Sequence, residues 1–182
     1  VGIIGLGSIG KELIKRLNVF GSKIIGYGRS WNAEFANKFN VDRKSIQEVF
    51  EESDIITIHL PLTSETKGLI NKDIIKLAKN NALILNTSRA GVVDNDALVN
   101  AISVKNIKAA IDVFDEERDP YPYAEIEDVI LTPHIASHTF ETRKSMEEMA
   151  SKTLVIFDSI TNKDTSENID EKLSYISKHS VK

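Results

Sequence analysis

The sequence predicts an α/β fold with a doubly wound parallel sheet that is covered by helices on both faces. Short apolar runs alternate with amphipathic stretches along the 182 residues, and a glycine-rich loop follows the first apolar run directly. Strands that are apolar throughout are typical of parallel sheets buried on both faces. Ligands of such sheets bind beyond the carboxyl ends of the strands, so we expect the functional residues just after each strand.

The first part of the chain alternates predicted strands with predicted helices. Apolar runs predict strands at residues 1–4, 23–27 and 54–58. Apolar residues at helical spacing up to Leu17 predict a helix after the first strand, and Gly21 ends it. Ser45 and Glu48 form the Ser-x-x-Glu pattern of a capping box and predict the start of a short helix.

The second part continues this alternation. Further apolar runs predict strands at residues 83–86, 107–113 and 129–132. Ile74 and Leu77 mark a helix before the first of these strands, and Asp94 can cap a helix that holds Leu98. A long helix is predicted over residues 138–160, with an apolar stripe that we expect in a core: Met146, Met149, Ala150, Leu154, Phe157 and Ile160.

The composition narrows the class of protein. Hydrophobic residues make up 41% of the chain and charged residues 27%, which is typical of a soluble globular protein. The formal net charge of −4 provides no basic footprint for nucleic acid, and no apolar run approaches the ~20 residues that cross a membrane. We therefore expect neither partner. The chain has no Cys, which excludes disulfides and Cys-ligated zinc, and we predict no metal site.

Gly5, Gly7 and Gly10 form the pattern Gly-x-Gly-x-x-Gly between the first strand and the first helix. The first glycine permits a tight turn, the second lets the backbone approach a pyrophosphate, and the third lets the helix pack closely on the sheet. The helix N-terminus, at Ser8 and Ile9, then offers free N–H groups to the phosphates. The motif predicts a dinucleotide-binding domain of the Rossmann type, and the alternative is a purely structural glycine turn.

The end of the second strand bears on the choice of cofactor. The position that commonly holds an acidic residue, about 20 residues after the first glycine, is Gly28 here. Gly28 has no carboxylate that would repel a 2′-phosphate. Arg29 can form a charge-assisted hydrogen bond to that phosphate, and Ser30 adds a hydroxyl donor. We predict NADP as the preferred cofactor, with NAD still possible. In the alternative interpretation Arg29 is solvated or stacks on the adenine.

Four further segments carry recognisable motifs. Residues 86–94 read Asn-Thr-Ser-Arg-Ala-Gly-Val-Val-Asp, residues 112–117 begin Asp-Val-Phe, residues 132–137 begin Thr-Pro-His, and residues 59–63 read His-Leu-Pro-Leu-Thr. From residue 1 to about 150 the chain closely resembles the D-isomer-specific 2-hydroxyacid dehydrogenase family. The resemblance implies an oxidoreductase that transfers a hydride between NADP(H) and a small 2-keto or D-2-hydroxy acid of the glyoxylate, hydroxypyruvate/glycerate or phosphoglycerate type.

The resemblance also implies a catalytic set of Arg89, Glu117 and His134. The planar fork of Arg89 suits a substrate carboxylate, His134 can exchange a proton with the substrate oxygen, and Glu117 can orient the imidazole. Glu116 takes the part of Glu117 if the register differs by one. The cofactor contacts implied beyond the glycine loop and residues 28–30 are His59, Leu60, Pro61, Thr66, Thr87, Ser88, Asp112, Ala136 and Ser137.

The family has a second lobe, built largely from residues upstream of the glycine motif, and we expect that lobe to be largely absent from this chain. We predict a dinucleotide-binding domain over residues 1–160 and a C-terminal segment over 161–182 that returns to the other lobe. The chain alone should then bind cofactor and turn over poorly. The resemblance further implies a homodimer, and we expect a cytoplasmic location. The alternative function is a dinucleotide-sensing interaction protein, because the family includes co-repressors.

Overall fold

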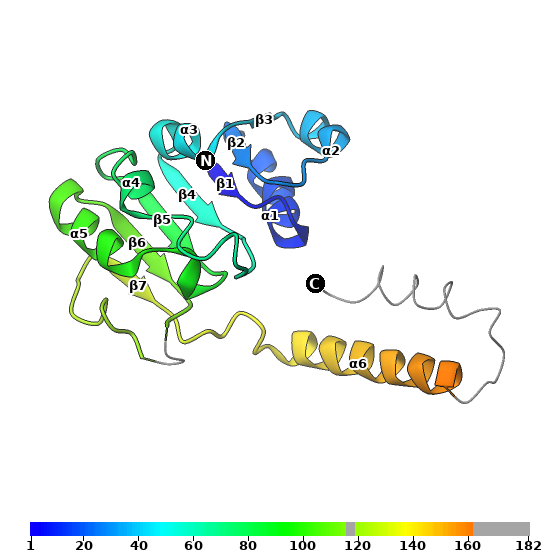
Figure 1. Cartoon of the computed structure of the whole chain (residues 1–182). Coiled ribbons are helices and arrows are strands. Elements are labelled where there is room, and N and C mark those ends of the chain that lie inside the picture. The colour runs from blue at the N-terminus through cyan, green and yellow to red at the C-terminus, as the bar shows by residue number, and fades with distance from the viewer. Residues whose placement is uncertain (116–118, 162–182) are drawn as a thin grey trace. The chain divides into compact units, whose positions relative to one another are not determined.

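The computed structural model describes residues 1–115 and 119–161, with the backbone alone for 155–161. The chain divides into two units, Val1–Ile135 and Ala136–Lys182. The first unit holds a seven-stranded parallel sheet with the strand order β3-β2-β1-β4-β5-β6-β7 (Figure 1). Its strands are β1 (Gly2–Ile4), β2 (Ile24–Tyr27), β3 (Val41–Arg43), β4 (Ile55–Ile58), β5 (Leu83–Asn86), β6 (Lys108–Ile111) and β7 (Val129–Leu131). Because the chain proceeds outward from β1 in both directions, the predicted doubly wound sheet is confirmed.

Helices connect the strands of the first unit. They are α1 (Ser8–Val19), α2 (Ala33–Lys38), α3 (Ile46–Glu52), α4 (Lys72–Ile75) and α5 (Asn95–Lys105), with a short 3-10 helix η1 (Ala90–Val92) before α5. Gly21 has φ +69° just after α1, as a helix-ending glycine should. The capping box at Ser45 and Glu48 is present, and the Asp94 side chain accepts a hydrogen bond from the backbone N–H of Ala97. These predicted helix boundaries are confirmed.

Strand β3 and helix α2 were not predicted. Only Val41 is apolar and buried in β3, so three residues carry no strand period that a sequence could reveal. The strand exists because its backbone pairs in parallel with β2, from Val41 opposite Ile24 to Arg43 opposite Gly26. Asn32 caps α2 by accepting from the backbone N–H of Phe35. Tertiary pairing thus supplies what local propensity lacks.

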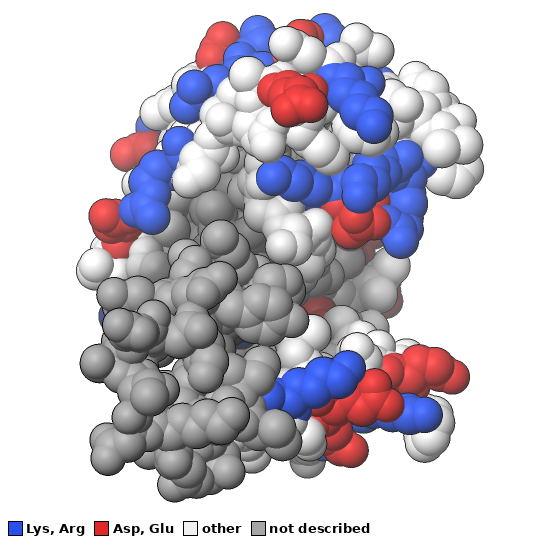
Figure 2. Space-filling view, turned by 90° about the vertical axis from the view of Figure 1, so that its right-hand side faces the viewer, with Lys and Arg blue, Asp and Glu red and all other residues white. Residues whose placement is uncertain are grey.

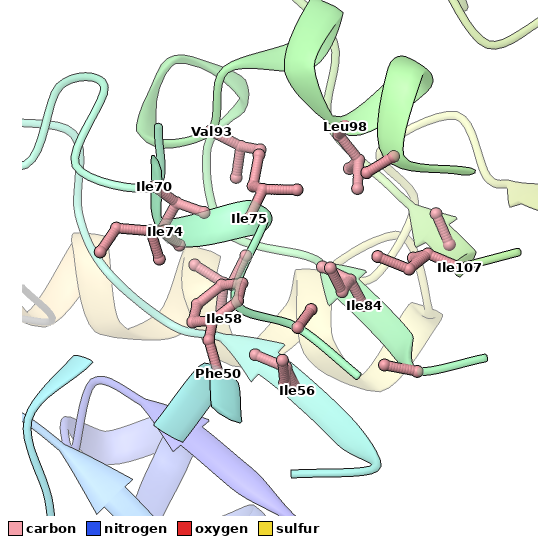
Figure 3. Packing of buried hydrophobic residues seen from close by; sticks show 14 of the residues in the cluster. Phe50, Ile56, Ile58, Ile70, Ile74, Ile75, Ile84, Val93, Leu98 and Ile107 are labelled. Carbon is pink, nitrogen blue, oxygen red and sulfur yellow. The ribbon is translucent and has the colours of Figure 1, made fainter. Parts of the chain in front are cut away.

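Helices cover both faces of the sheet. Neighbouring residues of a strand point to opposite faces, and both Ile3 and Ile4 of β1 are fully buried. Ile3 packs in a cluster with residues of α1 and α2, while Ile4 belongs to a larger cluster. The larger cluster joins the strands to α3, α4 and α5 (Figure 3), and its labelled members include Phe50, Ile58, Ile75, Ile84 and Leu98. This core therefore packs against both faces of the sheet.

The second unit contains α6 (Phe140–Thr161), close to the predicted helix over 138–160. Met146, Met149 and Leu154 of its apolar stripe are 51%, 39% and 69% exposed, so the expectation that these residues form a core is wrong within this unit. A helix buries its stripe only against a second element, and α6 is the one element described in its own unit. Among the described helices, none is long and apolar enough to cross a membrane.

The described surface carries both signs of charge. In Figure 2, Lys and Arg side chains lie interspersed with Asp and Glu side chains on the face that is turned to the viewer. The ion pairs include Lys44 with Glu52, and Lys79 with Asp54. The described part of this face therefore carries both signs of charge.

Candidate functional site

The motif-bearing segments meet at one edge of the sheet. In a parallel sheet all strands end at the same edge, and each predicted motif follows a strand directly. In sheet order from β2 to β7 the first residues of these segments are Gly28, Gly5, His59, Thr87, Asp112 and Thr132. Residues separated by more than a hundred positions in sequence are therefore brought to one edge of the sheet. We call the segments that follow the strands at this edge the rim.

The three glycines of the first loop have different roles. Gly5 has φ +103°, and a Cβ there would lie 2.5 Å from the carbonyl oxygen of His59. A Cβ on Gly10 would lie 2.2 Å from the carbonyl oxygen of Gly5. Gly5 and Gly10 are thus required by the turn itself. A Cβ on Gly7, in contrast, would meet no described atom within 4 Å, so packing does not explain this glycine. Open space at Gly7 fits the close approach of a ligand to the backbone.

The N-terminus of α1 is the second feature of this loop. Gly7 is its N-cap, and among the described side chains none caps the helix. Ser8 and Ile9 are exposed, with Ile9 at 68%. The first turn therefore presents N–H groups and the positive end of the helix dipole to solvent, which suits an anionic group such as a pyrophosphate.

The segment after β2 carries more charge than was predicted. Arg29 donates from Nη1 to the carboxylate of Glu65, which lies in the loop after β4. Arg43 of β3 donates from Nη2 to the carbonyl oxygen of Gly28 at 3.5 Å, and its guanidinium lies over the Trp31 ring at 5.4 Å. The sequence drew attention to Arg29 alone. Arg43 and Glu65 are distant from it in sequence, and only the strand order reveals them.

The loop after β4 is fixed by its own hydrogen bonds. The ring Nε2 of His59 lies 2.9 Å from the hydroxyl of Thr57, and burial lowers the pKa of this histidine. The Thr66 hydroxyl donates to the carbonyl oxygen of Pro61 at 2.5 Å and accepts from the backbone N–H of Thr63 at 2.8 Å. Leu60 is half-buried beside the core. The imidazole of His59 and the hydroxyl of Thr66 thus stabilise the protein's own loop.

Asn86 organises the turn after β5. Its side chain is buried, and its Oδ1 accepts from the backbone N–H of Ser88 at 3.1 Å and from the Ser88 hydroxyl at 2.9 Å. Its Nδ2 donates to the carbonyl oxygen of Arg89 at 3.1 Å. Thr87 and Arg89 themselves are exposed. Arg89 uses Nη1 to reach the carbonyl oxygen of Ser88, so much of its planar fork is accessible to an anionic ligand.

Asp112 connects the ends of β6 and β7. It is 5% exposed, and its Oδ1 accepts from the Thr132 hydroxyl and, at 3.4 Å, from the backbone N–H of Ile135. Its Oδ2 is buried and has no partner among the described residues. A buried carboxylate oxygen without a donor is costly, so a ligand that brings an N–H group would satisfy it.

His134 stands on the turn that Asp112 holds. Its side chain is exposed, and its backbone has φ +54°, in the left-handed region that few residues other than glycine adopt. Such strained positions cluster at functional sites. Glu117, the predicted partner of His134, lies outside the described residues, as does Glu116. Ala136 and Ser137 begin the second unit, and their role stays a prediction.

A cleft of about 350 Å³ opens beside the start of α5. Four aspartates line it: Asp94, Asp96, Asp115 and Asp119. Asn95 also lines the cleft, and it donates to the carboxylate of Asp115 and accepts from the hydroxyl of Tyr123, both at 2.8 Å. Burial raises the pKa of Tyr123, which keeps it a donor. The negative charge of this cleft would repel an organic acid, so we place no substrate there.

Three independent observations indicate that the rim suits a dinucleotide. These are the open space at Gly7, the uncapped start of α1 and the unpartnered oxygen of Asp112. The first two suit the phosphates, and the third suits the amide of a nicotinamide ring. The turn itself accounts for Gly5 and Gly10 but not for Gly7, which favours a ligand over a purely structural glycine turn.

Comparisons with known proteins point the same way. Residues 1–136 match the family described as D-isomer specific 2-hydroxyacid dehydrogenase, NAD binding domain. The chain is 42% identical over 161 residues to the glyoxylate reductase of Thermococcus litoralis and 41% identical over 160 residues to that of Aeropyrum pernix. Each match covers 86% of this chain and 48% of the relative, so the chain spans about half the length of the curated relatives it matches.

Solved structures agree with the sequence relatives. The structure of D-lactate dehydrogenase from Aquifex aeolicus, described as complexed with NAD and lactic acid, matches with a TM-score of 0.79 at 30% identity. The match covers 87% of this chain and 53% of that one.

Proposed function

We propose, from the premise that the chain belongs to the D-isomer specific 2-hydroxyacid dehydrogenase family, that it is the nucleotide-binding half of a reductase of a small 2-keto acid. The relatives named as glyoxylate reductases favour glyoxylate or a close analogue such as hydroxypyruvate as the substrate. The single observation that supports the proposal is the order of the strands, in which β5, β6 and β7 are neighbours and the segments that follow them carry Arg89, Asp112 and His134.

The cofactor would lie across the rim from β2 to β6. Gly7 and the start of α1 would hold its pyrophosphate, residues 28–30 its adenosine end, and Asp112 its nicotinamide amide. When bound, it supplies the hydride. We propose NADP(H) as the preferred form, because Gly28 places no carboxylate where a 2′-phosphate would be read and two arginines, Arg29 and Arg43, lie near that position.

The chain's own residues would bind the acid and move the proton. Arg89 presents an accessible guanidinium that can bind the substrate carboxylate through two parallel hydrogen bonds and polarise the neighbouring ketone. His134 would donate a proton to the ketone oxygen in reduction and take it back in oxidation. Glu117 would bond the far nitrogen of the imidazole and favour its charged form.

The other half of the relatives' length would complete the cleft. We propose that a second lobe closes over the cofactor, that the segment 161–182 returns to it, and that the whole protein is a cytoplasmic homodimer. The chain alone should then bind cofactor with half a cleft and turn over slowly. These proposals rest on the family and on the share of each relative that the chain spans.

The experiment is an assay of NADPH oxidation by the full-length protein with glyoxylate and hydroxypyruvate. We expect turnover with at least one acid, and loss of turnover but retention of NADPH binding in His134→Ala. Tight NADPH binding without turnover of any small 2-keto acid would contradict the enzyme and favour a dinucleotide-sensing protein. Efficient turnover by this chain alone, at confirmed intact mass, would contradict the need for a second lobe.

A further inference from the structure

We propose that Glu65 is a specificity-determining residue of the cofactor site, which restrains the preference for a 2′-phosphate by pairing with Arg29. The inference rests on the dinucleotide site proposed above and adds to it a residue that opposes the phosphate. Arg29 donates to the Glu65 carboxylate, although the two residues lie 36 positions apart. The pair joins the segment after β2 to the loop after β4.

The strand order places the two segments that hold this pair after the two neighbours of β1. Strands β2 and β4 are the two neighbours of β1, and the loop of Gly5 to Gly10 follows β1. The segments that hold Arg29 and Glu65 therefore flank the glycine loop from opposite sides. A carboxylate that reaches Arg29 across this position stands at the adenosine end of the proposed cofactor, where a 2′-phosphate would need the same donors.

The backbone around Glu65 is held by a turn, and both side chains of the pair are exposed. Glu65 lies within a turn in which Thr63 and Thr66 bond each other's backbone N–H groups, at 2.8 and 3.3 Å. The backbone N–H of Lys67 also donates to the carbonyl oxygen of Thr63 at 2.9 Å. The side chains of Arg29 and Glu65 are 81% and 66% exposed, so the pair can open and Arg29 can turn from the carboxylate to a ligand. The turn keeps the Glu65 carboxylate within reach of Arg29, and Arg29 can exchange this carboxylate for a ligand.

The charges of Glu65 and Arg29 then affect the affinities for NADPH and NADH differently. An exposed ion pair is weak, and a phosphate carries more negative charge than a carboxylate, so NADPH can displace Glu65 from Arg29. NADPH must, however, break the pair and approach the Glu65 charge, whereas NADH leaves the pair intact. Arg43 donates to Gly28 and lies over Trp31 in either case, so a second cation still favours the phosphate. Glu65 thus reduces the selectivity for NADPH without abolishing it.

The test is calorimetric titration of this chain with NADPH and NADH. The variants are Glu65→Gln, Arg29→Ala and the double variant, and Glu51→Gln removes a glutamate of α3 as the control. We expect Glu65→Gln to tighten NADPH about three- to tenfold and to change NADH less than twofold, because only NADPH competes for Arg29. In the Arg29→Ala background the gain should fall below twofold. Glu51→Gln should change neither affinity more than twofold.

The outcomes separate this inference from the function on which it rests. An equal gain for both nucleotides, or a gain that persists without Arg29, overturns the role of the Glu65–Arg29 pair. NADH binding by the wild-type chain would still support the dinucleotide site in that case. Binding of neither nucleotide by any variant overturns both the inference and the site.

Discussion

The Asp112 carboxylate accepts a hydrogen bond from the backbone N–H of Ile135 at 3.4 Å, and this bond ties the residue after His134 to the end of β6. The same oxygen accepts from the hydroxyl of Thr132, the residue two positions before His134. One buried side chain therefore fixes both flanks of the turn that carries the proposed acid. Its second oxygen is left for a ligand, so cofactor contact and acid placement share one residue.

The two hydrogen bonds that Asp112 accepts predict how Asp112 and Thr132 contribute to stability. Asp112→Ala removes the acceptor for two donors and should lower the free energy of unfolding by about 1–3 kcal/mol. Thr132→Val removes one hydroxyl donor and should cost about 1 kcal/mol. Urea denaturation measures both values. Loss of stability in Thr132→Val that clearly exceeds the loss in Asp112→Ala would contradict the account, because the whole carboxylate would then contribute less than one of its two hydrogen bonds.

The glycines of the first loop should separate folding from binding. Gly10→Ala places a Cβ 2.2 Å from the carbonyl oxygen of Gly5, so the backbone must shift and the melting temperature should fall by several degrees. Gly7→Ala places a Cβ in open space and should melt within about 2 °C of the wild type. Thermal unfolding followed by circular dichroism decides between them. A stable Gly10→Ala beside an unfolded Gly7→Ala would contradict the assigned roles.

His59 predicts a pH dependence of stability. Burial lowers its pKa below the ordinary 6.5, so the unfolded state binds the proton more readily than the folded state. Stability should therefore be unaffected above about pH 7.5 and should fall as the pH drops through 6.5 toward the folded-state pKa. His59→Gln should flatten this slope, as measured by urea denaturation between about pH 5 and 8. An unchanged slope in this variant, with His138→Gln as the control, would contradict the assignment.

Substitutions of His134 should affect turnover and stability separately. His134→Asn keeps a residue that tolerates the left-handed backbone, so melting temperature and NADPH affinity should stay near those of the wild type. The amide cannot exchange the proton, so kcat of the full-length protein should fall by about 10²-fold or more. His134→Val should instead lose about 1–2 kcal/mol of stability, because a β-branched side chain resists φ +54°. Equal stability of both variants would argue against backbone strain at this position.

The sheet could be predicted from the sequence because six of its strands are apolar runs bounded by breaks in the pattern. Strand β3 could not, since Val41 alone carries its apolar signal and its pairing with β2 is tertiary. The rim could be predicted because motifs directly after parallel strands must share an edge. Confirmed boundaries such as Gly21 and the Ser45 capping box rest on local chemistry that a sequence displays.

The parts of the site that the sequence did not reveal depend on side-chain partners far apart in the chain. Glu65 appears as an ordinary loop residue until the order β2-β1-β4 brings it to Arg29. Arg43 belongs to the strand that was missed, and nothing local connects it with Gly28. Tyr123 reaches Asn95 across 28 positions, in a segment without a motif. Charge pairing and buried hydrogen bonds of this kind need the fold before they can be read.

The most direct test of the central claim is titration of this chain with NADPH, beside Gly7→Ala as the matched variant. The account predicts that the wild type binds one NADPH per chain and that Gly7→Ala, still folded, binds at least tenfold more weakly. The added Cβ would occupy the space that the pyrophosphate needs. Equal affinity in the two proteins would mean that the nucleotide binds elsewhere, and no binding to the wild type would contradict a cofactor site built by this chain alone.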